Sequence, residues 1–140
     1  MAAPKWILVA DDDEFVRELC CEALTRAGYR TLQAQTGHDA IELMRVVVPD
    51  LMMLDLRMPG LSGSDVLRYL QASPALRQIP VLIFSGFLDD EEPRSSVGLN
   101  VVGRLAKPLT LVRLIDAVRA ALEPPRRPPG PSSIPPPRRP

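Results

Sequence analysis

Uninterrupted apolar runs recur along the chain, and each of them ends at a polar or charged residue. Three such runs occupy residues 6–10, 51–54 and 81–84. A short apolar run bounded by polar residues is typical of a strand covered on both faces, as in a parallel sheet flanked by helices. Two weaker segments complete the set: residues 101–105, and residues 30–35, whose alternation predicts a half-exposed edge strand. The pattern therefore predicts five strands.

Apolar residues at three-and-four spacing predict helices between these strands. Their expected inner positions are Val16, Leu19, Cys20, Ala23, Leu24 and Ala27; then Ala40, Ile41, Met44, Val47 and Val48; then Val66, Leu67 and Leu70; and finally Leu111, Leu114, Ile115, Val118 and Leu122. A further helix at residues 88–98 is the weakest, because it has few apolar positions and contains Pro93. Five strands alternating with five helices predict an α/β fold, with a parallel sheet sandwiched between two helical layers.

Short local signals set the expected helix ends. Gly28 and Pro49 should end the first two helices, and Thr36 and Thr110 should begin the second and the last. Ser62 and Asp65 have the spacing of a capping box. Asp13 and Glu14 suit the positive end of the first helix better than a metal site. His38 is expected to be exposed in the first turn of the second helix, where it is a poor candidate for catalysis.

Length and composition indicate one folded domain over residues 1–122 and a tail over residues 123–140. The tail is rich in proline and arginine and should be disordered or polyproline-like. The whole chain has 17 basic and 17 acidic side chains, which favours neither nucleic acid nor a membrane as an obligatory partner. No apolar stretch approaches the length of a membrane span, so a cytoplasmic location is expected.

The two cysteines, Cys20 and Cys21, are neighbours in sequence. This arrangement strains a mutual disulfide and does not have the spacing of zinc ligands. We expect one of them in the core and the other on the surface of the same helix. A reducing compartment fits this use of cysteine best.

Polar residues follow four of the predicted strands: Asp11 and Asp12, Asp55, Ser85 and Lys107. The carboxyl ends of parallel strands lie at one edge of the sheet, so these residues should converge there. Neighbouring carboxylates repel one another unless a cation or a proton intervenes, and an all-oxygen ligand set favours Mg²⁺ over zinc. A carboxylate beside a cation and a lysine is suited to phosphoryl transfer. We therefore predict Asp55 as a phospho-acceptor, with Ser85 as a hydrogen-bond donor to the phosphoryl group.

Residues 5–122 resemble the receiver domain of two-component response regulators, a bacterial signalling module. The matching motifs are Ile-Leu-Val-Ala-Asp-Asp-Asp at residues 7–13, Leu-Asp-Leu-Arg-Met-Pro-Gly at 54–60, Phe-Ser-Gly at 84–86 and Ala-Lys-Pro at 106–108. The resemblance implies a flavodoxin-like (βα)5 fold, a three-layer sandwich whose five-stranded parallel sheet has the order 2-1-3-4-5.

The resemblance also implies roles for individual residues. Asp11 and Asp12 would bind Mg²⁺ directly or through water, the backbone carbonyl of Arg57 would complete the coordination, and Asp55 would receive the phosphoryl group. The donor would be a histidine kinase or a phosphotransfer protein. In this family the peptide bond between the lysine and the proline is typically cis. A phosphorylation-dependent dimer is compatible with the resemblance.

Two positions depart from the family pattern. Arg104 stands three residues before Lys107, where receivers usually carry an aromatic residue that is coupled to the hydroxyl group of Ser85 as a switch. Arg57 and Phe87 stand two residues after Asp55 and Ser85, where the family tunes dephosphorylation. Neither is an acid or an amide that would orient an attacking water, which predicts a persistent phosphoryl group.

The leading functional prediction is a stand-alone phosphorylation switch, a single-domain response regulator that alters the binding of a downstream protein or passes its phosphoryl group on. It would be a phospho-acceptor rather than an enzyme.

The alternative is a phosphorylation-independent adaptor with a receiver-like fold that uses Arg104 in a constitutive binding face. A magnesium-dependent phosphatase with an aspartyl nucleophile is disfavoured, because its second catalytic aspartate would stand where this chain has Arg57. A solvated cluster of acids without a ligand is the alternative interpretation of Asp11, Asp12 and Asp55, and it is disfavoured because acids at the ends of buried strands are costly without a partner.

Overall fold

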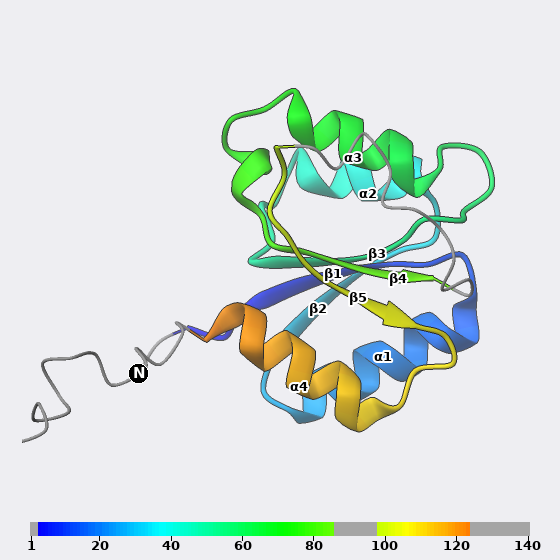
Figure 1. Cartoon of the computed structure of the whole chain (residues 1–140), viewed down its shortest axis with the longest axis vertical. Helices are drawn as coiled ribbons and strands as arrows, with labels where there is room; N and C mark the ends of the chain where they lie inside the picture. The colour runs from blue at the N-terminus through cyan, green and yellow to red at the C-terminus, as the bar shows by residue number, and fades with distance from the viewer. Residues whose placement is uncertain (1–2, 86–97, 124–140) are drawn as a thin grey trace, which may run out of the picture.

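Five parallel strands form one sheet in the order β2-β1-β3-β4-β5 (Figure 1). The computed structural model describes residues 3–85 and 98–123. The strands are β1 (Trp6–Ala10), β2 (Arg30–Ala34), β3 (Leu51–Asp55), β4 (Val81–Ser85) and β5 (Val101–Ala106). β3 is buried at every position, which agrees with its unbroken apolar run. The predicted sheet order and the three-layer architecture are confirmed.

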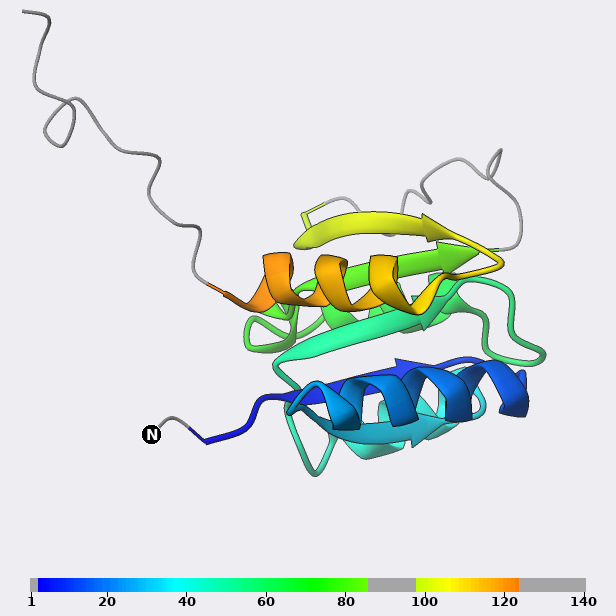
Figure 2. The ribbon, with the colours of Figure 1, turned by 90° about the horizontal axis from the view of Figure 1, so that it is seen from below.

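Among the described residues, two helices pack on each face of the sheet (Figures 1 and 2). α1 (Glu14–Arg26) and α4 (Leu111–Leu122) pack on one face, around a core that includes Ile7, Val9, Met53 and Phe84. α2 (Gly37–Met44) and α3 (Gly63–Gln71) pack on the other, and a short 3₁₀ helix, η1 (Leu76–Gln78), follows α3. Successive residues of β1 and β3 thus alternate between two hydrophobic cores.

The local signals for the helix starts are confirmed. Asp13, Thr36 and Thr110 each accept a hydrogen bond from the backbone N–H three residues ahead, as N-cap residues do. Ser62 and Asp65 form the reciprocal capping box that begins α3. Gly28, just after α1, has a φ of 99°, a conformation that favours glycine at a helix end.

The end of the second helix was predicted too late. α2 ends at Met44, so Val47 and Val48 lie beyond it, and the side chain of Val48 is largely exposed. Residues 46–48 are three consecutive β-branched residues, which have a low helix propensity. Pro49 also disfavours helical backbone in the residue before it. The helix predicted at residues 88–98 lies almost entirely outside the described residues.

The buried faces of α1 and α4 agree with the prediction at Cys20, Leu24, Leu114 and Val118, but other positions differ. Leu19 and Leu111, both expected in the core, are exposed, whereas Arg17 and Cys21 are buried. Cys20 is buried as well, so the prediction of one core and one surface cysteine was wrong. His38 is exposed in the first turn of α2, as expected. None of the helices within residues 3–85 and 98–123 is long and apolar enough to cross a membrane.

Candidate functional site

Three residues from separate strand ends meet at the carboxyl edge of the sheet. Asp11 follows β1 directly, Asp55 is the last residue of β3, and Lys107 follows β5. The Lys107 Nζ atom lies 2.9 Å from Asp11 Oδ2 and 3.2 Å from Asp55 Oδ2. Both carboxylates are buried, and the lysine side chain is 22% exposed. The parallel topology has brought together an acid pair and an ammonium group from distant parts of the sequence.

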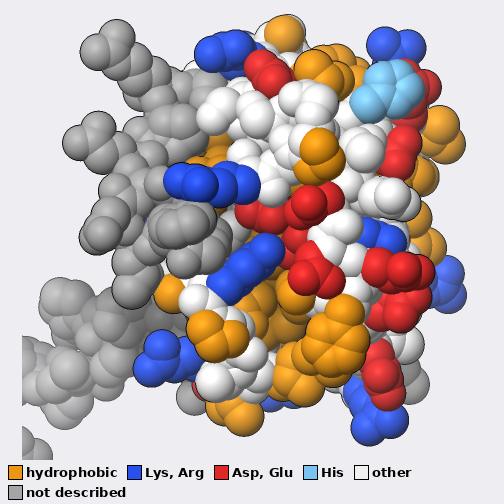
Figure 3. Space-filling view, turned by 90° about the vertical axis from the view of Figure 1, so that its right-hand side faces the viewer, with side chains coloured by type: hydrophobic (Ala, Val, Ile, Leu, Met, Phe, Trp, Pro, Cys, Tyr) orange, Lys and Arg blue, Asp and Glu red, His pale blue; other side chains and the backbone are white. Residues whose placement is uncertain are grey.

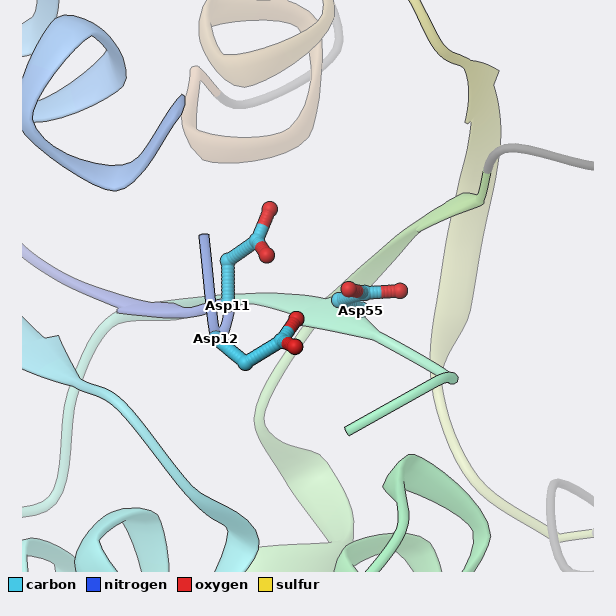
Figure 4. Close-up of side chains that lie close together, drawn as sticks. All are labelled: Asp11, Asp12 and Asp55. Carbon is cyan, nitrogen blue, oxygen red and sulfur yellow. The ribbon is translucent and has the colours of Figure 1, made fainter. Parts of the chain in front are cut away.

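Asp12 adds a third carboxylate on the solvent side of this cluster. One carboxylate oxygen from each of Asp11, Asp12 and Asp55 lies within 4.8 Å of the others, and Figure 4 shows the three side chains gathered at the ends of β1 and β3. Asp12 is exposed, unlike its two neighbours. The cluster thus has a buried floor and an open side.

The donor set of this cluster fits a hard divalent cation. Three carboxylates and one ammonium leave a formal net charge of −2 at the site. Asp11 Oδ2 is buried and has no hydrogen-bond partner among the described residues, so its 2.9 Å contact with Lys107 is an ion pair without hydrogen-bond geometry. Oxygen ligands and excess negative charge are what Mg²⁺ prefers. The residues present could therefore hold this ion.

The site perturbs the ionisation of its members. Burial raises the pKa of Asp55 to about 6, and the amide of Arg57 and the charge of Lys107 act against this rise. Burial would lower the pKa of Lys107, but its contacts with Asp11 and Asp55 outweigh burial and raise the pKa above its ordinary value. Lys107 is therefore a lasting positive charge beside the two acids.

Backbone contacts fix the two buried carboxylates. Asp11 Oδ1 accepts a hydrogen bond from the N–H of Asp13 at 2.9 Å, and Asp55 Oδ1 accepts one from the N–H of Arg57 at 3.1 Å. The loop after β3 is held close to α3, because Gly63 donates a hydrogen bond to the carbonyl of Leu56 and a Cβ atom at Gly63 would lie 2.7 Å from the carbonyl oxygen of Asp55. One oxygen of each carboxylate is thus oriented by the backbone, and the other contacts Lys107.

The remaining predicted site residues are placed as follows. Ser85 ends β4 and pairs with Ala106, next to Lys107, but its side chain lies outside the described part of the structure. Arg57 follows Asp55 by two residues and is exposed. Arg104 lies in β5 opposite Ile83, and its side chain is exposed. The peptide bond between Lys107 and Pro108 is cis, as the resemblance implied.

An apolar groove adjoins the acidic cluster. It has a volume of about 390 Å³, and its lining includes Phe15, Leu19, Lys107 and Leu111. The side chain of Phe15 is 73% exposed. Figure 3 shows this edge of the molecule, with acidic side chains near the centre and hydrophobic ones beside them. The groove forms because α1 and α4 are oriented so that Leu19 and Leu111 lie on the surface instead of in the core.

No role at the site was predicted from the sequence for two residues that lie next to it, Phe84 and Arg17. Lys107 Nζ lies 4.9 Å from the centroid of the Phe84 ring, which forms an apolar floor under the ammonium. Arg17 is buried, and its Nη1 atom donates a hydrogen bond to the backbone carbonyl of Asp11 at 2.8 Å. The available signal was the spacing of Arg17, Cys20, Cys21 and Leu24, which places an arginine on the buried face of α1.

Comparison with known proteins agrees with this geometry. The family model described as the response regulator receiver domain matches residues 7–119. The polar-differentiation response regulator DivK of Brucella anthropi is 30% identical over 121 residues, which cover 85% of this chain and 97% of DivK.

Solved structures show the same fold. A response regulator receiver protein from Pseudomonas putida matches with a TM-score of 0.75 and 32% identity, covering 85% of this chain and 98% of that one. The chemotaxis response regulator CheY4 of Vibrio cholerae matches with a TM-score of 0.78 over 86% of this chain and all of CheY4. At 21% identity, the latter match concerns the fold alone.

Proposed function

The chain belongs to the family of response regulator receiver domains, and on that premise we propose that it is a phosphorylation switch with Asp55 as its phospho-acceptor. Phosphoryl acceptance is general to the family, whose members are switches rather than conventional enzymes. The observation that carries the assignment to Asp55 is the convergence of this buried carboxylate with Asp11 and with the ammonium of Lys107.

The proposed reaction is an in-line displacement at phosphorus. An ionised carboxylate oxygen of Asp55 forms a bond to the phosphorus atom of a phosphohistidine, and the bond between phosphorus and the imidazole nitrogen breaks. The imidazole nitrogen keeps the electron pair of that bond. Lys107, 3.2 Å from Asp55 Oδ2, offsets negative charge on the transferring group. The N–H of Arg57 holds the other carboxylate oxygen in place during the attack.

Receiver domains bind Mg²⁺ at an acidic pocket, and here Asp11, Asp12 and Asp55 would hold it, with the carbonyl of Arg57 as a further proposed ligand. When bound, the ion supplies positive charge to the oxygens of the phosphoryl group. Ser85 would donate a hydrogen bond to the phosphoryl group after transfer. Arg104, in β5, would take part in the surface change that follows.

The apolar groove is the proposed contact surface for the phosphodonor. A donor histidine must approach Asp55 from the open side of the cluster, and Phe15, Leu19 and Leu111 lie beside that approach. Exposed apolar side chains around a reactive group suit a helical partner whose own apolar residues flank the histidine. A histidine kinase or a phosphotransfer protein of the bacterial cytoplasm is the proposed donor, and a downstream protein is the proposed target.

Intact-mass measurement tests the assignment. The native chain, incubated with acetyl phosphate and MgCl₂, should gain one phosphoryl group per chain, and Asp55→Asn should gain none. Asp116→Asn, which changes an exposed acid on α4, is the matched control and should behave like the native chain. A native chain that gains no phosphoryl group from acetyl phosphate or from any autophosphorylated histidine kinase would instead support the phosphorylation-independent adaptor.

A further inference from the structure

Arg17 is a buried arginine that the proposed phosphoryl chemistry does not use. Its side chain is 8% exposed and points from the first turns of α1 toward the end of β1. Nη1 donates a hydrogen bond to the backbone carbonyl of Asp11 at 2.8 Å, and Nε donates one to Gln33 Oε1 at 3.0 Å. A buried guanidinium is costly unless it is hydrogen-bonded, so these two contacts fix the position of the whole group.

The carbonyl that Arg17 binds belongs to the peptide bond between Asp11 and Asp12. On the other side of Asp11, its N–H donates to the carbonyl of Ala34 and continues the pairing of β1 with β2. The Asp11 backbone is therefore held at both its N–H and its carbonyl. Because a peptide unit is planar, the direction of the Asp11 carbonyl also sets the direction in which the chain enters Asp12.

Asp12 depends on this orientation more than its neighbours do. The carboxylates of Asp11 and Asp55 are buried, and each accepts a backbone hydrogen bond, whereas Asp12 is exposed. Its carboxylate nevertheless lies within the 4.8 Å cluster. The hydrogen bond from Arg17 to the preceding carbonyl is the side-chain contact that holds the peptide leading into Asp12, beside the backbone bond from Asp13 N–H to Asp11 Oδ1.

We propose that Arg17 is a positioning residue for Mg²⁺, which orients the Asp11–Asp12 peptide so that both carboxylates face the ion; this rests on the metal site of the proposed function. Gln33 acts through Arg17, since it holds the Nε side of the guanidinium. Groups that orient metal ligands from behind typically change metal affinity by about 10- to 100-fold when they are removed.

A titration of the full chain with MgCl₂, monitored by ¹H–¹⁵N NMR spectra at a temperature where the protein is folded, tests this proposal. Arg17→Met should weaken Mg²⁺ binding by about tenfold or more, and should shift the Asp12 amide resonance of the metal-free protein. Arg17→Lys keeps the charge but cannot make both contacts, so it should recover only part of the affinity. The control is Arg26→Met on the same helix, where the arginine is exposed and paired with Glu22, and its affinity should stay within about twofold of native.

Native affinity in folded Arg17→Met, or full recovery in Arg17→Lys, would overturn the proposal. A loss of thermal stability alone, with an unchanged dissociation constant, would also overturn it, because that is the result of a purely structural arginine. If Arg17→Met does not fold, Gln33→Ala decides, since Gln33 is exposed: weaker Mg²⁺ binding supports the proposal, and native binding contradicts it. A native chain that does not bind Mg²⁺ would contradict the metal site itself, whereas equal binding by native and Arg17→Met proteins contradicts only the role of Arg17.

Discussion

The ammonium of Lys107 lies 3.2 Å from the carboxylate of Asp55, although 52 positions separate the two residues in the sequence. The same ammonium lies 2.9 Å from the fully buried carboxylate of Asp11. Lys107 thus serves as the internal counter-charge for two acids that would otherwise repel each other across the sheet edge. This arrangement makes the stability of the fold and the chemistry of the site depend on the same three side chains.

Replacement of Lys107 by Met should destabilise the metal-free protein at neutral pH. Two buried carboxylates would lose the ammonium between them, and such a loss costs about 3 kcal/mol of unfolding free energy. Saturating MgCl₂ should restore part of the stability, because the ion would supply the missing charge. Urea denaturation with and without MgCl₂ measures both effects, and Arg113→Met on the exposed face of α4 is the control. Equal urea midpoints for Lys107→Met and the control would contradict the counter-charge role.

Asp55 should make the metal-free protein less stable as the pH rises. Its folded-state pKa, raised from 3.8 to about 6, means that the folded state binds the proton more tightly than the unfolded state. The contribution of Asp55 to the unfolding free energy is therefore fully present below pH 3.8 and is lost as the pH rises through about 6.

The Asp55→Asn variant allows this pH dependence to be measured, because its carboxamide resembles the protonated carboxyl group of Asp55. Its stability advantage over the native chain should grow across that pH range by on the order of 2 kcal/mol. Chemical denaturation in EDTA at a series of pH values gives the difference, with Asp116→Asn as the exposed control. A stability difference between Asp55→Asn and the native chain that does not vary with pH would show that burial does not perturb Asp55.

The phosphoryl group on Asp55 should persist for minutes or longer. Arg57, two residues after Asp55, has a side chain without a carboxylate or carboxamide to orient a water molecule for attack, and the same holds for Phe87 in the sequence. Intact-mass measurement over time, after removal of acetyl phosphate, gives the lifetime. Arg57→Asn should shorten it several-fold, while Arg68→Asn on the exposed face of α3 should not. Loss of the phosphoryl group from the native protein within seconds would refute this prediction.

The apolar groove should matter for a protein donor but not for a small one. Phe15→Ser should slow phosphoryl transfer from an autophosphorylated histidine kinase by about tenfold, as expected if Phe15 is one of the few interface residues whose loss costs more than about 1 kcal/mol. The rate with acetyl phosphate should change by less than about twofold. Phosphotransfer assays with a panel of kinases provide the comparison. Val46→Ser is the control, because Val46 is 84% exposed just after α2, away from the groove. An equal loss with both donors would mean that Phe15 acts on the site itself.

Much of the fold was predictable from short-range patterns. Unbroken apolar runs located the central strands, and the capping residues Thr36, Ser62 and Thr110 located helix starts, because strand burial and N-cap hydrogen bonds depend on a few neighbouring residues. The meeting of Asp11, Asp55 and Lys107 was predictable as well, since parallel strands place their carboxyl ends at one edge.

The sequence by itself therefore determined the sheet and the acids and lysine at its edge. The apolar spacing also predicted Cys20, Leu24, Leu114 and Val118 as buried, but only the tertiary structure decided the rotation of α1 and α4 in detail, because the rotation of a helix depends on where it crosses the sheet. In the folded protein Arg17 and Cys21 are buried and Leu19 and Leu111 are exposed, whereas the apolar spacing had predicted the two leucines in the core. Arg17 is stable in the interior because the carbonyl of Asp11 and the side chain of Gln33 lie there to accept its hydrogen bonds. Those acceptors lie just after β1 and in β2, so they reach Arg17 only after the helix has packed against the sheet.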